Sequence, residues 1–354
     1  MKMVFRPFDL QLSHTWTIAS GAKTGGGSNV ARVVLVRLTD GNITGLGECP
    51  TSTRYAESVD SMQDFLRRVD ASKISFDDIP GSMAYVDKVA PKNHSAKGAV
   101  NVALLDGAGK KAGKPIYDLL GLGFSEKKHL TSFSIGMDTA EVIYQKTLKA
   151  APYPVLKLKV GADGDRENMA ALRKAAPDKT VRVDANEGWT TKEEALRNIE
   201  WLAKDPNIEF VEQPMPASTP PKDLAWLKSR SPLPLFGDES YHHAGDATLC
   251  ADCYHGVNVK LLKTGGVSAA FEALQAARQA GLKTMIGCMI ETSILITAAA
   301  HLAELTNHLD IDGNILINND PYLGAASDKG MISFASAPEP FGLRVKARQD
   351  DPFA

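Results

Sequence analysis

Apolar and charged residues alternate with a two-residue period from Tyr153 to Gly161, in the run Y-P-V-L-K-L-K-V-G. This alternation predicts a β-strand with Lys157 and Lys159 on one face and the leucines on the other. Ammonium groups held close together lower a lysine pKa and make a neutral amine available as a base. An edge strand with a solvated lysine face fits this segment alone equally well.

Similar strand patterns recur about every 25 residues after Gly123, with helical stretches such as 192–203 and 268–280 between them. Right-handed crossovers between parallel strands close naturally into a barrel. We therefore predict an α/β fold with a (β/α)7β TIM-type barrel whose last unit is short. Its strands are expected at 132–135, 155–160, 181–184, 209–212, 235–238, 257–260, 284–287 and 308–312.

The first 120 residues have a different pattern. A strand over 32–38 and a second one from Ile43 flank the turn T-D-G-N, which predicts a hairpin. Helical spacing follows over 56–69 and 95–112. We predict an α+β domain over 1–123, a barrel domain over 124–324, and an irregular tail over 325–354 that returns to the first domain.

Composition is that of a soluble globular protein, with 44% hydrophobic and 23% charged residues and a formal net charge of −2. This balance does not favour nucleic acid as a partner. The longest apolar runs, such as 294–305, are too short to span a membrane. Met1 leads directly into Lys2 and Arg6 without an apolar signal core, so we expect a cytoplasmic protein.

Two local motifs have simple readings. Cys250 and Cys253 have C-x-x-C spacing, but no second pair accompanies them, so free thiols are expected rather than a zinc or redox site. The glycine-rich stretch 17–28 lacks the G-K-[ST] of a phosphate-binding loop and opens no helix. We expect a mobile loop there.

Three carboxylates end three consecutive predicted strands: Asp184 in V-R-V-D, Glu212 in F-V-E and Asp238 in L-F-G-D. The carboxyl ends of barrel strands line the active site. Ligation by oxygen alone suits Mg²⁺ and lacks the histidine or cysteine that zinc prefers. We expect one Mg²⁺ per subunit at this rim; one such carboxylate alone would be read as a helix N-cap.

Lysines flank the carboxylate row, with Lys159 on the second barrel strand and Lys260 on the sixth. Across a barrel mouth they approach a central ligand from opposite faces. One amine removes a proton next to a carboxylate or amide and the other returns it to the opposite face, through an enolate whose oxygens a metal holds. The pattern predicts a 1,1-proton transfer.

The chain resembles the enolase superfamily, in its muconate-lactonizing subgroup, over nearly its whole length. The resemblance rests on V-L-K-L-K-V, D-A-N, E-Q-P, D-E-S, N-V-K-L-L-K-T-G-G and the G-L-G-E-C-P of the first domain. It implies a lysine acid/base pair working with Mg²⁺. It also implies that the first domain is a cap whose loops, 17–28 and 49–56, close over the barrel. The residues it assigns are Asp184, Glu212 and Asp238 as metal ligands and Lys159 and Lys260 as the acid/base pair.

Subgroup members include muconate cycloisomerases, o-succinylbenzoate synthases, N-acylamino-acid racemases and dipeptide epimerases. Asp310-Ile311-Asp312 matches the D-x-D with which dipeptide epimerases bind the substrate's free ammonium, and two carboxylates on one strand face make a cation site. This favours an isomerase acting on dipeptides, with the other three activities as alternatives. A turn cap is the simpler reading of the two aspartates, and a ligand-binding barrel without catalysis is a further alternative.

The resemblance suggests further substrate contacts. Lys157 is expected to hold the substrate carboxylate, and Ser132 is a second contact by family position. Related L-Ala-D/L-Glu epimerases often place an arginine in the first cap loop to hold the glutamate side chain. This loop carries Lys23 instead, which leaves the side-chain preference open. Relatives commonly assemble, so a homo-oligomer is expected.

Overall fold

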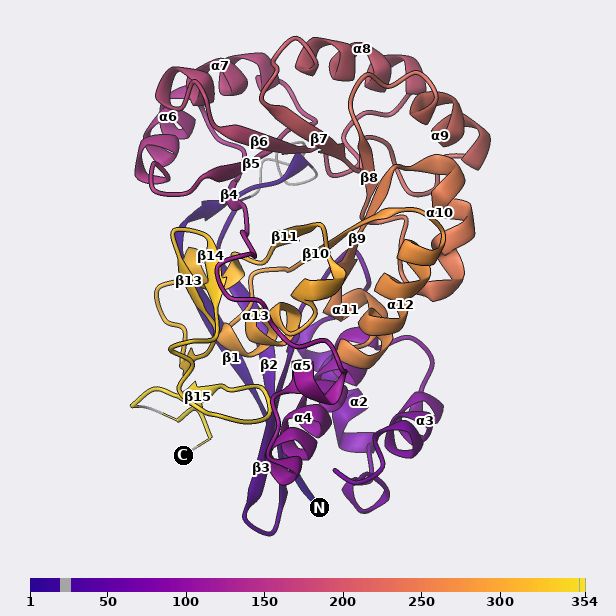
Figure 1. Cartoon of the computed structure of the whole chain (residues 1–354), viewed down its shortest axis with the longest axis vertical. Helices are drawn as coiled ribbons and strands as arrows, with labels where there is room; N and C mark the ends of the chain where they lie inside the picture. The colour runs from indigo at the N-terminus through magenta and orange to yellow at the C-terminus, as the bar shows by residue number, and fades with distance from the viewer. Residues whose placement is uncertain (20–26, 350, 354) are drawn as a thin grey trace.

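The largest part of the molecule is a parallel sheet of eight strands that curls into a barrel (Figure 1). The computed structural model describes residues 1–19, 27–349 and 351–353. Along the sheet the strands follow one another in chain order. Their bounds are β4 (Phe133–Ile135), β5 (Val155–Lys159), β6 (Thr180–Asp184), β7 (Ile208–Glu212), β8 (Leu235–Gly237), β9 (Gly256–Lys260), β10 (Lys283–Gly287) and β11 (His308–Asp310).

A short seam closes this barrel between its first and last strands. Thr131 forms a parallel bridge with Leu309, and the backbone N–H of Ser132 donates to the Leu309 carbonyl at 3.2 Å. The predicted (β/α)7β barrel is confirmed. Because β5 pairs with both β4 and β6, the reading of this segment as an edge strand with solvated lysines is wrong.

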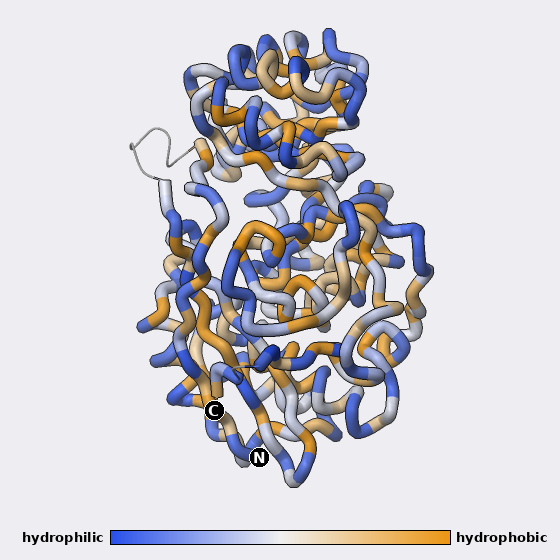
Figure 2. Tube along the Cα trace, turned by 90° about the vertical axis from the view of Figure 1, so that its left-hand side faces the viewer, coloured by the Kyte–Doolittle hydropathy of each residue, from blue (hydrophilic) through white to orange (hydrophobic). Residues whose placement is uncertain are grey.

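Helices between the strands cover the outside of the barrel. In α8, buried Ala195, Ile199 and Leu202 recur with helical spacing, so one stripe faces the sheet. Figure 2 shows hydrophobic and hydrophilic positions alternating along these helices. No helix in the described ranges is long and apolar enough to cross a membrane. The barrel helices are α6 (Ala140–Lys149), α7 (Asp165–Ala175), α8 (Lys192–Leu202), α9 (Pro221–Lys228), α10 (Ala247–Cys253), α11 (Leu261–Thr264), α12 (Val267–Gln279) and α13 (Ser293–Ala300).

The N-terminal part is an antiparallel sheet in the order β1-β2-β3 with helices packed on it. The long strand β1 was not predicted. Pro7 interrupts its alternating pattern, and an edge strand tolerates such a proline because one side needs no donor. The elements are β1 (Lys2–Trp16), β2 (Ser28–Asp40), β3 (Ile43–Pro50), α2 (Val59–Arg68), α3 (Ile79–Val89), α4 (His94–Ala112) and α5 (Ile116–Leu119).

The glycines of G-L-G-E-C-P allow α4 to lie directly on β3. A Cβ atom built on Gly45 would lie 2.0 Å from the carbonyl oxygen of Ala103, and one built on Gly47 would lie 2.0 Å from that of Ala99. Real side-chain atoms do not approach backbone this closely. Only glycine fits at these two positions, and the two glycines of the motif are therefore explained by the close packing of α4 on β3.

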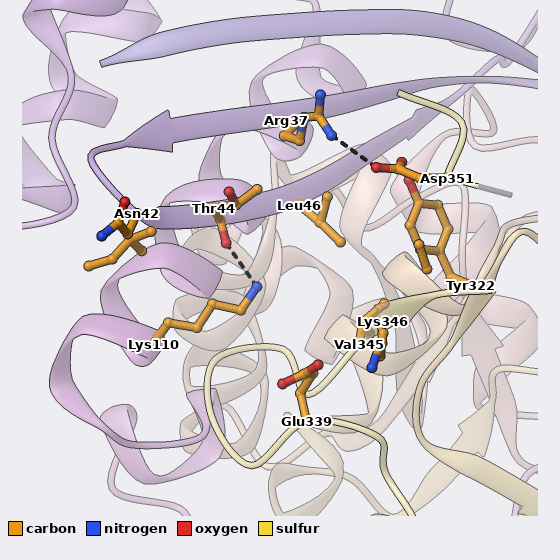
Figure 3. A pocket seen from close by; sticks show the side chains of 12 residues that line it. Arg37, Asn42, Thr44, Leu46, Lys110, Tyr322, Glu339, Val345, Lys346 and Asp351 are labelled. Carbon is orange, nitrogen blue, oxygen red and sulfur yellow. Dashed lines mark hydrogen bonds and ion pairs between the residues drawn. The ribbon is translucent and has the colours of Figure 1, made fainter. Parts of the chain in front are cut away.

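The C-terminal tail returns to the first sheet, as predicted. Asp351 pairs with Arg37 of β2 at 3.0 Å, and both line a pocket of about 430 Å³ (Figure 3). The tail is more regular than expected, since it contributes strands to two small antiparallel pairs. These are β12 (Tyr322–Leu323) with β15 (Lys346–Ala347) and β13 (Ala326–Asp328) with β14 (Met331–Ser333). The domain boundaries at 123/124 and 324/325 stay predictions.

A buried carboxyl group joins the first sheet to the barrel. Glu48 of β3 accepts hydrogen bonds from the backbone N–H of Thr292, at 2.9 Å, and from its hydroxyl. Thr292 is the N-cap of α13. Burial raises the pKa of Glu48 from 4.5 to about 8, and the nearby Glu291 adds to the rise. The folded state therefore favours the protonated form of Glu48.

Between pH 4.5 and 8 the folded chain holds a proton at Glu48 that the unfolded chain has released, so stability falls as pH rises through this window. As the pH is raised from about 5 to about 8, we expect the melting temperature of Glu48→Gln to fall less than that of wild type. Thermal unfolding monitored at several pH values measures this. The exposed Glu272→Gln is the control and should keep the wild-type profile. Parallel profiles for all three proteins would contradict the assignment.

Candidate active site

Charged side chains gather where the barrel strands end. Lys157 and Lys159 lie on β5, Asp184 ends β6, Glu212 ends β7, and Lys260 ends β9. Each of these residues is at least nine-tenths buried, as is Asp238, which directly follows β8. The strands of a barrel direct their carboxyl ends to one rim, and that is how residues distant in the sequence come together. The structure therefore brings the predicted catalytic and metal-binding residues into one cluster.

Lys157 lies at the centre of this cluster. Its Nζ is 3.1 Å from Asp184 Oδ2, 2.7 Å from Glu212 Oε2 and 2.6 Å from Asp310 Oδ2. The side chain is 1% exposed. Lys157 thus links two of the predicted metal ligands to the predicted ammonium site.

The two outer lysines bind different carboxylates. Lys159 Nζ donates to Asp184 Oδ2 at 2.6 Å, and Lys260 Nζ donates to Asp238 Oδ2 at 2.8 Å. In the eight-stranded barrel, β5 and β9 are four strands apart. Lys159 and Lys260 therefore stand on opposite sides of the barrel mouth.

Neighbouring carboxylates determine the direction of the pKa shift of two of the lysines. Burial alone lowers the pKa of Lys260, but the charges of Asp238 and Glu212 outweigh burial and hold it well above the ordinary value. The pKa of Lys157 is raised in the same way by Asp184, Asp310 and Glu212. The expectation that neighbouring ammonium groups lower the lysine pKa is wrong for Lys157, because this ammonium faces three carboxylates. Lowering of the pKa of the two outer lysines by a bound metal ion stays a prediction.

The carboxylate row fits a hard divalent cation, since all its donor atoms are oxygens. Burial, together with the charge of Asp184, raises the pKa of Glu212 to about 7, and a bound cation would offset the cost of keeping this buried carboxyl group ionised. Glu212 Oε2 makes no hydrogen bond within the described residues, although Lys157 Nζ is near. In those same ranges no three histidine, cysteine or acidic side chains surround one point closely enough for a ready-made metal site. Lys157 Nζ lies beside Asp184 and Glu212 instead.

Asp310 and Asp312 both turn toward β4. Asp310 Oδ1 accepts from the Ser132 hydroxyl at 2.6 Å, and Asp312 Oδ2 accepts from the Ser134 N–H at 2.6 Å. The Asp312 side chain does not cap the 3₁₀ turn that follows it (Gly313–Leu316). The simpler reading of these aspartates as turn caps therefore does not fit Asp312. Burial and the charge of Asp310 raise the pKa of Asp312 to about 7.

Two family models match the chain. The mandelate racemase/muconate lactonizing enzyme N-terminal domain matches residues 13–121, and the enolase C-terminal domain-like model matches residues 140–332. The chain belongs to the enolase superfamily. The resemblance found in the sequence is confirmed.

Individual relatives match over nearly the whole chain. A protein of Pedosphaera parvula named L-Ala-D/L-amino acid epimerase is 65% identical over 98% of this chain and 100% of its own length. An L-Ala-D/L-Glu epimerase of Bacteroides thetaiotaomicron is 37% identical over 96% of this chain and 86% of its own. A dipeptide epimerase of Enterococcus faecalis, solved in complex with Mg and the dipeptide L-Leu-L-Tyr, has a TM-score of 0.88 at 29% identity and covers 98% of this chain and 99% of its own.

Sequence reasoning missed Gln213, which fixes one carboxylate of this enolase-superfamily site. Its Oε1 accepts from the N–H of Asp238 at 2.8 Å, and its Nε2 donates to the carbonyl of Met215 at 2.8 Å and to the hydroxyl of Tyr254 at 3.2 Å. The amide thus ties the end of β7 to the start of the loop that carries Asp238. The signal was present, since Gln213 directly follows Glu212 in E-Q-P.

Two further polar residues, Asn258 and Lys263, bind members of the carboxylate row. Asn258 Nδ2 donates to Glu212 Oε1 at 2.8 Å. Lys263 Nζ contacts Asp238 Oδ1 at 2.5 Å and the Asn258 carbonyl at 3.0 Å. Lys263 is the second lysine of N-V-K-L-L-K, to which no role was assigned. Lys23 lies outside the described residues.

We expect Gln213→Ala to lower the free energy of unfolding by about 1–3 kcal/mol, because it leaves buried donors and acceptors without partners. The variant should also lose activity, because the Asp238 backbone loses its anchor. Denaturant unfolding and turnover measure the two effects. Exposed Gln145→Ala on α6 is the control, with an expected change below about 0.5 kcal/mol. A Gln213→Ala protein as stable as the control would contradict this role.

Proposed function

We propose that this protein is a dipeptide epimerase that inverts the α-carbon of the C-terminal residue of its substrate. The observation that carries the proposal is the pair Lys159 and Lys260, buried on opposite sides of one carboxylate row. Two bases on opposite faces suit removal of a proton from one side of a carbon and its return on the other. The relatives, which are named as epimerases, support the same reaction.

Asp184, Glu212 and Asp238 would hold the metal ion, and Mg²⁺ is supported by their oxygen donors and by the relative solved with Mg. When bound, Mg²⁺ neutralises the carboxylates that stabilise the lysine ammonium groups and offsets negative charge on the substrate carboxylate. One ion per subunit is part of the proposal. Asn258 and Gln213 keep Glu212 and Asp238 in place for this role.

The proton steps use the two Nζ atoms. In one direction the neutral amine of Lys159 accepts the α-proton, and the electron pair of the broken C–H bond moves onto the substrate carboxylate. The ammonium of Lys260 then donates its proton to the opposite face of the same carbon, and the electron pair returns to form the new C–H bond. The reverse direction exchanges the two roles, so both epimers are substrates.

Recognition of a dipeptide is assigned to the β4–β11 side of the mouth. Asp310 and Asp312 would receive the free ammonium group of the N-terminal residue. Asp312 Oδ1 meets only the thiol of Cys288, 4.0 Å away, within the described residues, so it retains capacity to accept a hydrogen bond. Ser132 would orient Asp310 toward the ammonium.

Lys157 carries an additional role in the proposal. Its contacts with Asp184, Glu212 and Asp310 join metal ligation to ammonium recognition, and its positive charge would steady the substrate carboxylate. Lys23 is proposed to pair with an acidic C-terminal side chain. A relative named for D/L-amino acids rather than for glutamate supports testing other side chains as well. A homo-oligomer remains part of the proposal.

We expect wild type with Mg²⁺ in D₂O to place deuterium at the α-carbon of the C-terminal residue of both epimers of a dipeptide. Lys159→Ala should abolish exchange for one epimer and Lys260→Ala for the other, because each lysine serves one face. Lys157→Ala should mainly weaken binding and shift the pH profile. Mass spectrometry of a dipeptide library measures exchange.

Lys111→Ala, on an exposed ion pair far from the barrel mouth, is the control and should exchange like wild type. Chelation of the metal should abolish exchange in every protein. Absence of exchange with all dipeptides, together with turnover of an acidic β-elimination substrate, would contradict the proposal and favour the o-succinylbenzoate synthase alternative, a lyase.

Asp312→Asn should weaken binding of dipeptides with a free ammonium group and spare N-acylated ones, because it removes a negative charge from the ammonium site. The ratio of KM values for a matched pair of free and acetylated dipeptides measures this. Ser134 can still donate its N–H to the asparagine oxygen, so the local structure should persist. An equal loss for both substrates would show that the ammonium assignment is wrong.

A further inference from the structure

A closed loop of the first domain, residues 52–57, reaches the barrel. Its base is fixed by paired backbone hydrogen bonds between Ser52 and Glu57, at 2.8 and 2.9 Å. Glu57 Oε1 also accepts from the N–H of Ser95 in the first turn of α4, at 3.1 Å. The loop therefore projects from a rigid base, and its position depends on what its tip touches.

The tip is held by an ion pair. Arg54 Nη2 lies 2.8 Å from Glu187 Oε1, in the loop after β6. The same oxygen accepts from the N–H of Ala217, in the loop after β7, at 2.7 Å. Glu187 has a positive φ of 64°, which non-glycine residues seldom adopt, and its N–H is held by the carbonyl of Gln213 at 2.9 Å. The Glu187 carboxylate thus connects two barrel loops to the loop of the first domain.

Tyr55, next to Arg54, packs against the loop after β8, on the side of the mouth that contains Lys260. Its ring meets that of His242 edge-on, with centroids 5.6 Å apart, and His242 Nε2 contacts the carbonyl of Glu239 at 2.9 Å. Its phenol interacts electrostatically with Asp238 and Lys260. Tyr55 is therefore anchored in the loop after β8, beside the strand that carries Lys260.

The opposite side of the mouth is approached by a different segment. The carbonyl of Thr17 accepts from the N–H of Met137, just after β4, at 2.9 Å. β4 is the neighbour of β5, which carries Lys159. The two lysines therefore lie next to different parts of the first domain, and loop 52–57 belongs to the Lys260 side.

Fold stability does not explain the ion pair, since Arg54 is 48% exposed and exposed ion pairs contribute little to stability. We propose that the Arg54–Glu187 ion pair is a positioning device that holds Tyr55 over the Lys260 half of the site, so that proton transfer at Lys260 depends on it more than transfer at Lys159. The Tyr55 ring would shield that half from water and fix the α-carbon against Lys260 Nζ. The inference rests on the proposed epimerase function.

The test measures α-proton exchange in D₂O separately for each dipeptide epimer. The epimer served by Lys260 is the one whose exchange is lost in Lys260→Ala. We expect Arg54→Gln, Glu187→Gln and Tyr55→Ala each to slow exchange of that epimer about tenfold and to slow the other epimer less than about twofold. Glu187→Gln keeps an acceptor for Ala217, so its effect isolates the contact with Arg54. Melting temperatures should stay near wild type.

Four further variants make the test more specific. The double variant Arg54→Gln/Glu187→Gln should be no slower than the slower single variant, because both remove one shared contact. Arg54→Lys keeps the charge and Tyr55→Phe keeps the ring. Both variants should therefore exchange the epimer served by Lys260 at close to the wild-type rate. Arg67→Gln is the matched control, since Arg67 forms an exposed ion pair with Asp64 on α2, and it should exchange like wild type.

Equal slowing of both epimers, or additive effects in the double variant, would overturn the positioning role while leaving the epimerase proposal intact. Absence of exchange in wild type would overturn the epimerase proposal itself. The two failures are thus distinguished by the wild-type measurement alone.

Discussion

The barrel mouth depends on the pairing of charges that are removed from water. An ammonium or carboxylate group that is buried alone is strongly destabilising, so each must face an opposite charge or a hydrogen-bond partner. Lys157 meets this demand with three carboxylates, and Lys159 and Lys260 do so with one each. The same ion pairs that offset the free-energy cost of burying these charges also hold both proposed bases at fixed positions.

The fold separates the tasks of the site between rigid and adjustable parts. The lysines and carboxylates lie on or directly after barrel strands, whose pairing fixes them to their neighbours. Loop 52–57 comes from the other sheet and reaches the mouth through side chains at its tip. A scaffold that fixes its charged groups on strands and adds further substrate contacts from loops can serve several substrates.

Much of this arrangement could be predicted because it follows from short repeating patterns. Alternation identified β5, and the charged residue at each strand end identified Asp184, Glu212 and Lys260. Contacts between distant segments were not predictable in this way, since Arg54 and Glu187 are 133 residues apart. The direction of the Lys157 pKa shift was not predictable for a related reason. A strand pattern shows neighbouring lysines, whereas the balance of charge depends on carboxylates from other strands.

The seam between β4 and β11 links recognition to the integrity of the barrel. Few backbone contacts hold this seam, and side chains reinforce it. The Ser132 hydroxyl donates to Asp310, the Ser134 N–H donates to Asp312, and the Thr131 hydroxyl accepts from the N–H of Ile311. The aspartates that we propose bind the substrate thus also hold the two end strands of the barrel together. Evolution toward a new substrate at this position is therefore constrained, because any replacement must also keep the barrel shut.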